Sequence, residues 1–144
     1  MTRYLLDTNV LSETRKAAMN PMVHAFLSEV NPDSLYVSVL SIGELRKGVE
    51  SKRQSDPTMA DRLLLWVDAM EHNFSDRILP ISMDIAKVWG QLSADRSRPV
   101  IDTLLAATAI VHDLVLVTRN VKDFQGIPIS TFDPWSGQLS TFRV

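Results

Sequence analysis

The sequence predicts an α/β domain in which a mainly parallel sheet is covered by helices on both faces. Two observations predict this class. Short, almost wholly apolar segments, such as residues 114–117, alternate along the chain with longer segments of helical periodicity. Strands buried on both faces are continuous apolar runs, as these are. At 144 residues and 45% hydrophobic side chains, the chain has the length and apolar content of a single domain over 1–144.

The first half of the chain predicts two strands and four helices. Strand formers fill the segments before Asp7 and after the turn at 31–33, and Pro21 marks a helix start, since apolar side chains recur from there at helical spacing. The expected elements are a strand over 4–6, a helix over 10–16, a helix from Pro21, a strand over 35–39, a helix from Ser41 to about Lys52, and a helix over 58–73.

The second half continues the alternation. Ser82 can cap a helix, and the segment 103–111 is apolar on nearly every side, so its helix should be central and packed against the sheet. The expected elements are a strand over 78–81, a helix from Ser82 to about Ala94, a basic loop over 96–99, a helix opened by Asp102, a strand over 114–117 and a strand over 127–132.

Composition excludes several classes of site. The chain contains no cysteine, which removes disulfides, thiolate zinc sites and cysteine nucleophiles. The apolar stretch at the N-terminus is too short for a signal peptide, and no run reaches the ~18 apolar residues of a membrane span. We therefore expect a soluble cytoplasmic protein. The formal net charge of −2 gives no sign of a nucleic-acid partner. The net charge would understate the protein's affinity for phosphates if several of the acids surrounded bound cations.

Four acids occupy positions that a parallel sheet would bring together. Asp7, Glu44 and Asp123 each follow a predicted strand, and Asp102 opens the helix that leads to the next strand. Ligands of such sheets bind outside the carboxyl ends of the strands. The order of elements along the chain thus predicts that these acids converge at one edge of the sheet.

Each acid also has a structural explanation. Asp7 and Asp102 can cap the helices that follow them. Ser41 and Glu44 match the capping-box pattern, in which a glutamate closes back on the residue three positions earlier. Asp123 can be a solvated acid in a turn. No single acid therefore establishes a site, and the hypothesis depends on their shared arrangement.

A cluster of carboxylates points to a hard metal ion. Packed carboxylates repel one another and raise one another's pKa unless cations neutralise them. Oxygen ligands alone suit Mg²⁺, with Mn²⁺ as a possible substitute. Such an ion can activate water and stabilise the charge that develops in phosphodiester cleavage.

Four short motifs contain these acids and together span almost the whole chain: residues 5–13 (LLDTNVLSE), 38–48 (SVLSIGELRKG), 99–109 (PVIDTLLAATA) and 116–124 (LVTRNVKDF). In this order and spacing, they resemble the motifs of the PIN-domain family, in particular those of the VapC-type toxins of bacterial toxin–antitoxin pairs. The resemblance implies a three-layer α/β/α sandwich and a Mg²⁺-dependent endoribonuclease that hydrolyses RNA. The implied protein partners are a small cognate antitoxin and a second copy of the chain in a homodimer.

The resemblance also implies roles for individual acids. Asp7 and Asp102 would hold the principal Mg²⁺, and Glu44 would complete the cluster or position a second ion. Relatives differ in the fourth position, which is filled here by Asp123 or Asn120. We favour Asp123 because it keeps the negative charge. The expected reaction leaves 5′-phosphate and 3′-hydroxyl ends.

Polar neighbours of the acids complete the predicted site. Asn9, Thr118 and Asn120 are candidates for orienting carboxylates or water. Several basic residues flank the acidic motifs and could bind RNA phosphates, although most surface cations are only solvated. These candidates are Arg15, Lys16, Arg46, Lys47, Arg96, Arg98, Arg119 and Lys122.

Two other functions compete with the ribonuclease. An aspartate-nucleophile phosphatase also begins with an apolar strand that ends in Asp, but it usually needs a second Asp two residues on, where this chain has Asn9. A non-catalytic binding module with the same fold is the other alternative. Retention of Asp7, Glu44 and Asp102 favours the enzyme.

Overall fold

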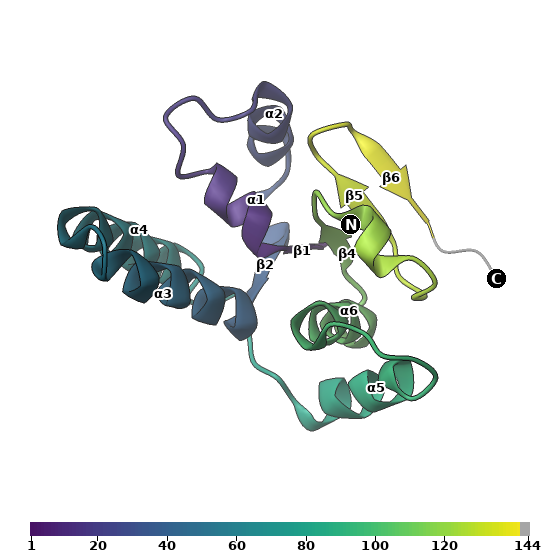
Figure 1. The fold of residues 1–144 in the computed structure, drawn as a ribbon. Helices are drawn as coiled ribbons and strands as arrows, with labels where there is room; N and C mark the ends of the chain where they lie inside the picture. Colours follow the sequence, from purple (N-terminus) through teal and green to yellow (C-terminus); the bar gives the residue numbers. More distant parts are fainter. Residues whose placement is uncertain (142–144) are drawn as a thin grey trace.

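The computed structural model describes residues 1–141 and is organised around a six-stranded sheet (Figure 1). The strands are β1 (Tyr4–Leu6), β2 (Leu35–Ser38), β3 (Ile78–Leu79), β4 (Val115–Val117), β5 (Thr131–Asp133) and β6 (Gln138–Ser140). Their order is β3-β2-β1-β4-β5-β6. Neighbours from β3 to β5 pair in parallel, whereas β6 is antiparallel to β5. The mainly parallel sheet is confirmed.

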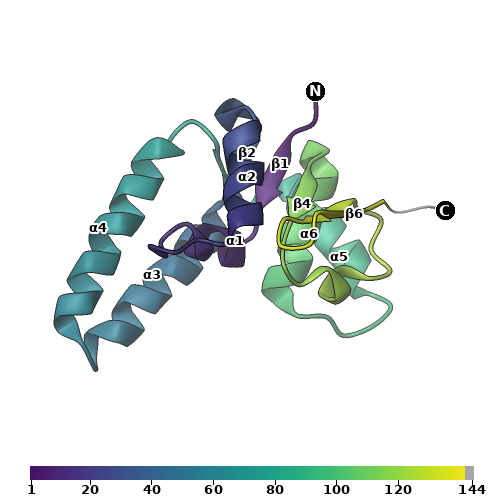
Figure 2. The same ribbon diagram turned by 90° about the horizontal axis from the view of Figure 1, so that it is seen from above.

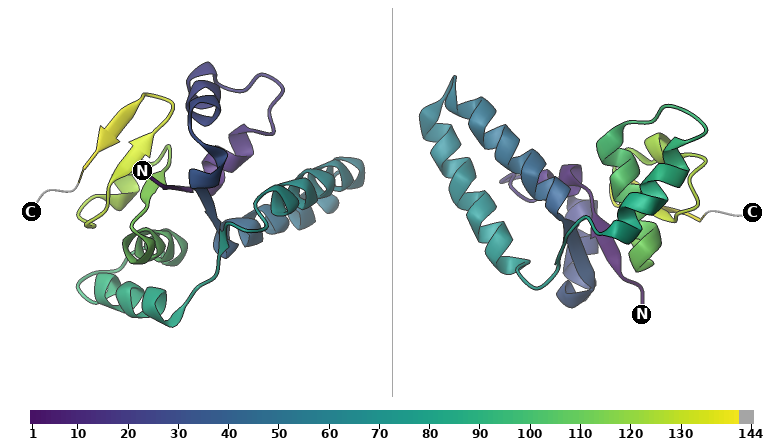
Figure 3. Two further views of the ribbon diagram at one scale, coloured as in Figure 1. Left: turned by 180° about the vertical axis from the view of Figure 1, so that it is seen from behind. Right: turned by 90° about the horizontal axis from the view of Figure 1, so that it is seen from below.

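Helices cover both faces of this sheet, so the molecule is a three-layer α/β/α sandwich. The α-helices are α1 (Thr8–Glu13), α2 (Pro21–Glu29), α3 (Val39–Arg53), α4 (Pro57–Asn73), α5 (Met83–Ser93) and α6 (Val100–His112). Two short 3₁₀ helices are η1 (Pro32–Ser34) and η2 (Val121–Phe124). Helices α3 and α4 form a long hairpin that projects from the sheet (Figure 2), and α5 packs beside α6 on the other side (Figure 3).

Alternate side chains of the strands supply two separate cores. Leu6 and Val37 point to the layer of α1 to α4, whereas Leu5 and Leu116 point to the layer of α6 and η2. All four are at most 2% exposed. Each such side chain contributes about 1.5–3 kcal/mol through burial. Because both faces are covered, the central strands β1 and β4 are apolar throughout, as the sequence predicts.

The observed start of α3 excludes one explanation of Glu44. The helix begins at Val39, and the Ser38 hydroxyl accepts a hydrogen bond from the Leu40 N–H at 3.0 Å. Ser41, the predicted first residue, is fully buried inside the first turn. The predicted start at Ser41 and the capping box of Ser41 and Glu44 are therefore wrong. Strand β2 ends one residue earlier than expected because Ser38 turns the chain into the helix.

Two further helix starts differ from the prediction. Helix α1 covers Thr8–Glu13 rather than 10–16, because Asp7 caps it directly at the end of β1. Helix α6 begins at Val100, where Pro99 is the capping residue and no side chain caps the helix. Asp102 therefore lies within the first turn, and its predicted role as the N-cap is wrong.

The later strands also differ. Strand β3 ends at Leu79, before Pro80, which has no N–H to donate to a sheet. The strand expected over 127–132 is shifted to Thr131–Asp133, because Pro128 interrupts the apolar run and residues 127–130 pack as a loop. Strand β6 was not predicted; Gly137, with φ of 76°, lies in the turn before it. No helix within residues 1–141 has the length and apolar character needed to cross a membrane.

Candidate metal centre

The candidate site lies where the strand order changes direction, between β1 and β4. Leu6 pairs with Val117, so the next residues, Asp7 and Thr118, lie side by side at the carboxyl edge of the sheet. The Thr118 hydroxyl donates to Asp7 Oδ2 at 2.9 Å. This is the point of an open parallel sheet where ligands bind.

Asp7 is buried and hydrogen-bonded. The residue is 7% exposed, and the Thr8 N–H donates to Oδ1 at 2.7 Å. Burial raises the pKa of Asp7, while the bonds from Thr118 and Thr8 lower it; the charges of Glu44 and Asp123 raise it again. The net pKa is above its ordinary value. A cation beside Asp7 would relieve this cost.

Helix α1 links Asp7 to Glu44 on α3. The hydroxyl of Thr8, the first residue of α1, donates to Glu44 Oε1 at 2.6 Å. The Glu44 side chain is otherwise exposed. A single residue, Thr8, thus holds one carboxylate through its backbone and another through its side chain.

Asp102 and Asp123 complete the cluster. Burial is the largest cause of the raised pKa of Asp102, followed by the charges of Asp7, Asp123 and Glu44. Within residues 1–141, the half-buried Asp102 side chain makes no hydrogen bond. Asp123 lies exposed on η2. The fold therefore gathers at one edge all four acids that the sequence singled out.

Thr118 is the centre of a polar network around Asp7. Its hydroxyl, fully buried, accepts from Asn9 Nδ2 at 3.3 Å and from the Asn120 N–H at 3.1 Å. Asn9 Nδ2 also lies 3.4 Å from Asp7 Oδ2. The three residues expected to orient the site are thus brought together. Asn120 takes part through its backbone.

The donor set suits a hard, hydrated cation. The four acids offer carboxylate oxygens alone, with no histidine or cysteine among them. Within residues 1–141, no three acid or histidine side chains are arranged to enclose one ion. Mg²⁺ keeps several waters and is held by one or two carboxylates, whereas zinc sites are built mainly from cysteine and histidine, of which this cluster has none. The residues therefore fit Mg²⁺.

The predicted RNA-binding cations differ in their surroundings. Arg46 is paired with Glu71 and Asp68, each at 2.8 Å. Arg98 Nε donates to the Leu92 carbonyl at 3.0 Å. The others include Lys16, paired with Glu13 at 2.9 Å; Arg96, bonded to the Gln125 carbonyl at 3.2 Å; and Lys47 and Lys122, both exposed.

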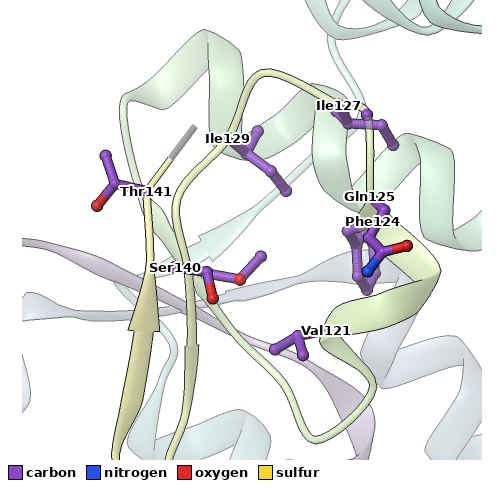
Figure 4. A pocket seen from close by; sticks show the side chains of 9 residues that line it. Val121, Phe124, Gln125, Ile127, Ile129, Ser140 and Thr141 are labelled. Atoms are coloured by element: carbon purple, nitrogen blue, oxygen red, sulfur yellow. The ribbon is translucent and has the colours of Figure 1, made fainter. Parts of the chain in front are cut away.

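Glu44 lines two hollows. One is a groove of about 350 Å³ that is also lined by Thr8 and Arg15. The other, of about 530 Å³, is also lined by Ile101, the neighbour of Asp102 in the sequence. A further hollow, of about 220 Å³, lies between η2 and the β5–β6 hairpin, and Figure 4 shows Phe124 and Ile129 among its side chains. None of the four acids lines this hollow.

Similar proteins cover nearly the full chain. VapC ribonuclease Y4jK of Sinorhizobium fredii is 29% identical, over 91% of this chain and 96% of that protein. A crystal structure of FitAcB from Neisseria gonorrhoeae has a TM-score of 0.82 at 29% identity, covering 92% of this chain and 98% of that one. A toxin–antitoxin complex from Klebsiella pneumoniae has a TM-score of 0.67 at 27% identity, covering 91% and 97%.

The family follows from these likenesses and from a direct match. The sequence pattern of the PIN domain matches residues 4–128, which include Asp7, Glu44, Asp102 and Asp123. The resemblance drawn from the four motifs is thereby confirmed, and the chain belongs to the PIN domain family.

Proposed function

We propose that this chain is a Mg²⁺-dependent endoribonuclease and the toxin of a toxin–antitoxin pair. The convergence of four carboxylates at the switch point of the sheet carries the proposal. Four carboxylates that repel one another destabilise a fold. A divalent cation bound among them would offset this repulsion and so explains why they lie together. The relatives named as a ribonuclease and as a toxin–antitoxin complex support the reaction and its biological setting.

The protein's own residues hold and orient the reacting groups. Asp7 and Asp102 would bind the cation, which supplies Lewis-acid chemistry for water activation and phosphate neutralisation. Thr118 and Thr8 fix the Asp7 carboxylate through Oδ2 and Oδ1. The Thr8 hydroxyl directs Glu44 toward the same edge. Mg²⁺ is the expected ion, and Mn²⁺ a possible replacement.

The fourth acid position remains assigned to Asp123. It carries a charge that acts on both Asp7 and Asp102. Asn120 is exposed beside it, and its backbone N–H is engaged with Thr118. We therefore assign the ligand role to Asp123 and a supporting role to Asn120.

We expect two protein partners. A cognate antitoxin would keep the nuclease inactive, in line with the similar toxin–antitoxin complex. A homodimer is the second expectation. Apolar side chains are available for such contacts, since Leu65 is 71%, Met83 72% and Val100 56% exposed.

The phosphatase alternative loses support from the site. Asn9, two residues after Asp7, contacts Asp7 and Thr118 by hydrogen bonds and supplies no acid–base group. A non-catalytic binding module remains the alternative, and a cleavage assay distinguishes it from the ribonuclease.

Cleavage of labelled total RNA by purified, antitoxin-free protein tests the proposal. We expect cutting with Mg²⁺, none with EDTA, and a loss of at least about 10²-fold in Asp7→Asn, which keeps a good helix cap. Asp84→Asn is the matched control, because Asp84 is exposed on α5 and lies outside the cluster. Folded wild-type protein that cuts no RNA with Mg²⁺ would favour the binding module. Equal losses of cleavage activity in Asp7→Asn and Asp84→Asn would contradict the role of Asp7 in cleavage.

A further inference from the structure

Arg119 lies at the edge of the sheet that carries the carboxylates. It directly follows Thr118, and its backbone N–H donates to Asn9 Oδ1 at 3.3 Å. Asn9 in turn contacts Asp7. The backbone of Arg119 is therefore fixed by the same network that holds the buried carboxylate.

The Arg119 side chain extends over an aromatic ring that the sequence did not single out. Its Cζ atom lies 5.0 Å from the centroid of the Trp135 ring. Trp135 follows β5, and β5 runs parallel to β4, so both residues leave their strands at the same edge. The Trp135 side chain packs against the core that contains Val117, and the backbone N–H of Trp135 donates to Asp133 Oδ1 at 2.8 Å. The ring is thus a fixed face beneath the guanidinium.

The donor groups of Arg119 are available, unlike those of several other arginines. Arg46 is paired with two acids, and Arg77 donates to three backbone carbonyls. Within residues 1–141, the Arg119 guanidinium makes neither an ion pair nor a hydrogen bond. A guanidinium resting on an indole keeps the N–H groups of its edge free for a bidentate contact.

We propose that Arg119 binds a backbone phosphate of the RNA and that Trp135 is the residue that positions its guanidinium. The proposal rests on the ribonuclease function proposed above. Four carboxylates repel an approaching phosphate, so a cation is needed beside them. Arginine suits this role because its planar fork matches two phosphate oxygens. Trp135 restricts the side chain and thereby reduces the ordering cost of binding.

Binding is measured separately from cleavage. The probe is a fluorescein-labelled, single-stranded RNA of mixed sequence, titrated by anisotropy over a series of salt concentrations. All proteins carry Asp102→Asn and are studied in EDTA, with probe integrity checked on a gel. We expect Arg119→Ala to weaken binding about 5- to 20-fold and to reduce the salt slope by ~0.7, the value for one contact with single-stranded phosphate. We expect Trp135→Phe to weaken it about 2- to 4-fold, since phenylalanine binds cations less well.

A matched arginine provides the control. Arg3 lies 5.8 Å from the Tyr36 ring centroid, but it precedes β1 and so stands at the opposite edge of the sheet. Arg3→Ala should leave affinity and salt slope unchanged. Wild-type affinity in Arg119→Ala, or an equal loss in Arg3→Ala, would overturn the phosphate contact. If Arg119→Ala weakens binding here but the wild-type protein cuts no RNA with Mg²⁺ in the cleavage assay, the phosphate contact stands and only the ribonuclease is refuted.

A double variant distinguishes positioning from packing. If Trp135 acts through Arg119, Trp135→Phe will cause no further loss when Arg119 is already alanine. A loss of the same size in both backgrounds would assign Trp135 a purely structural role and overturn this part of the proposal. Arg119→Lys, which keeps the charge without the planar fork, should recover the salt slope but only part of the affinity.

Discussion

Replacing Thr118 by valine removes the hydroxyl that holds Asp7 while keeping the shape of the side chain. The hydroxyl is fully buried and donates to the carboxylate at 2.9 Å. A hydrogen bond to a charged group contributes about 1.5–3 kcal/mol. The contact with Asn9 is longer, at 3.3 Å, and the exposed Asn120 can use water instead. We expect the free energy of unfolding at pH 7 to fall by about 2–3 kcal/mol.

The comparison that isolates this bond is Thr108→Val. Thr108 is equally buried, but its hydroxyl donates to the Leu104 carbonyl within α6 and touches no acid. Its loss should cost ~1 kcal/mol. Urea unfolding of both variants at pH 7 measures the difference. Equal losses would refute the conclusion that Thr118 stabilises a buried charge. Because this bond favours ionised Asp7, the extra loss in Thr118→Val should shrink as the pH falls.

Three further outcomes follow from the structure. The pKa of Asp102 is raised in the folded state, so its contribution to stability is greatest when it is protonated and declines as the pH rises above its ordinary pKa of 3.8. Without metal, Asp102→Asn should therefore unfold at a higher urea concentration than wild type, and the difference between their unfolding midpoints should grow from pH 4 to pH 7. A difference that does not change with pH would contradict this. Mg²⁺ at ~100 times its dissociation constant should stabilise wild type by ~2.7 kcal/mol in thermal unfolding but leave Asp102→Asn nearly unaffected. Equal stabilisation of both proteins would argue against a metal site that includes Asp102. Gly137→Ala should destabilise by ~1 kcal/mol because of its φ of 76°, while Gly90→Ala in α5, with open space around the added carbon, should stabilise by ~0.5–1 kcal/mol in the same urea assay.

The α/β class and the convergence of the acids could be predicted because both depend on order along the chain. Buried parallel strands such as β4 are apolar on both faces, which gives a clear signal. Once strands and helices alternate, residues after the strands must meet at one edge. Asp7, Glu44 and Asp123 were found in this way without knowledge of their contacts.

Features that depend on tertiary pairing could not be predicted in the same way. Strand β6 is exposed along its whole length, so it lacks an apolar pattern, and it forms because the turn at Gly137 returns the chain against β5. The start of α3 depends on where β2 leaves the sheet, and Ser38 and Ser41 are equally suitable caps by residue type. Trp135 was missed because its link to Arg119 arises only from the parallel pairing of β4 and β5.

The most direct test of the metal centre does not require the RNA target. Binding of Mn²⁺, followed by its electron paramagnetic resonance signal, can be measured for wild type, Asp102→Asn and the control Asp84→Asn. We expect one or two bound ions per chain in wild type and in the control, and at least about tenfold weaker binding in Asp102→Asn. Mn²⁺ binding of equal strength in all three proteins would contradict the assignment of the carboxylate cluster as the metal centre.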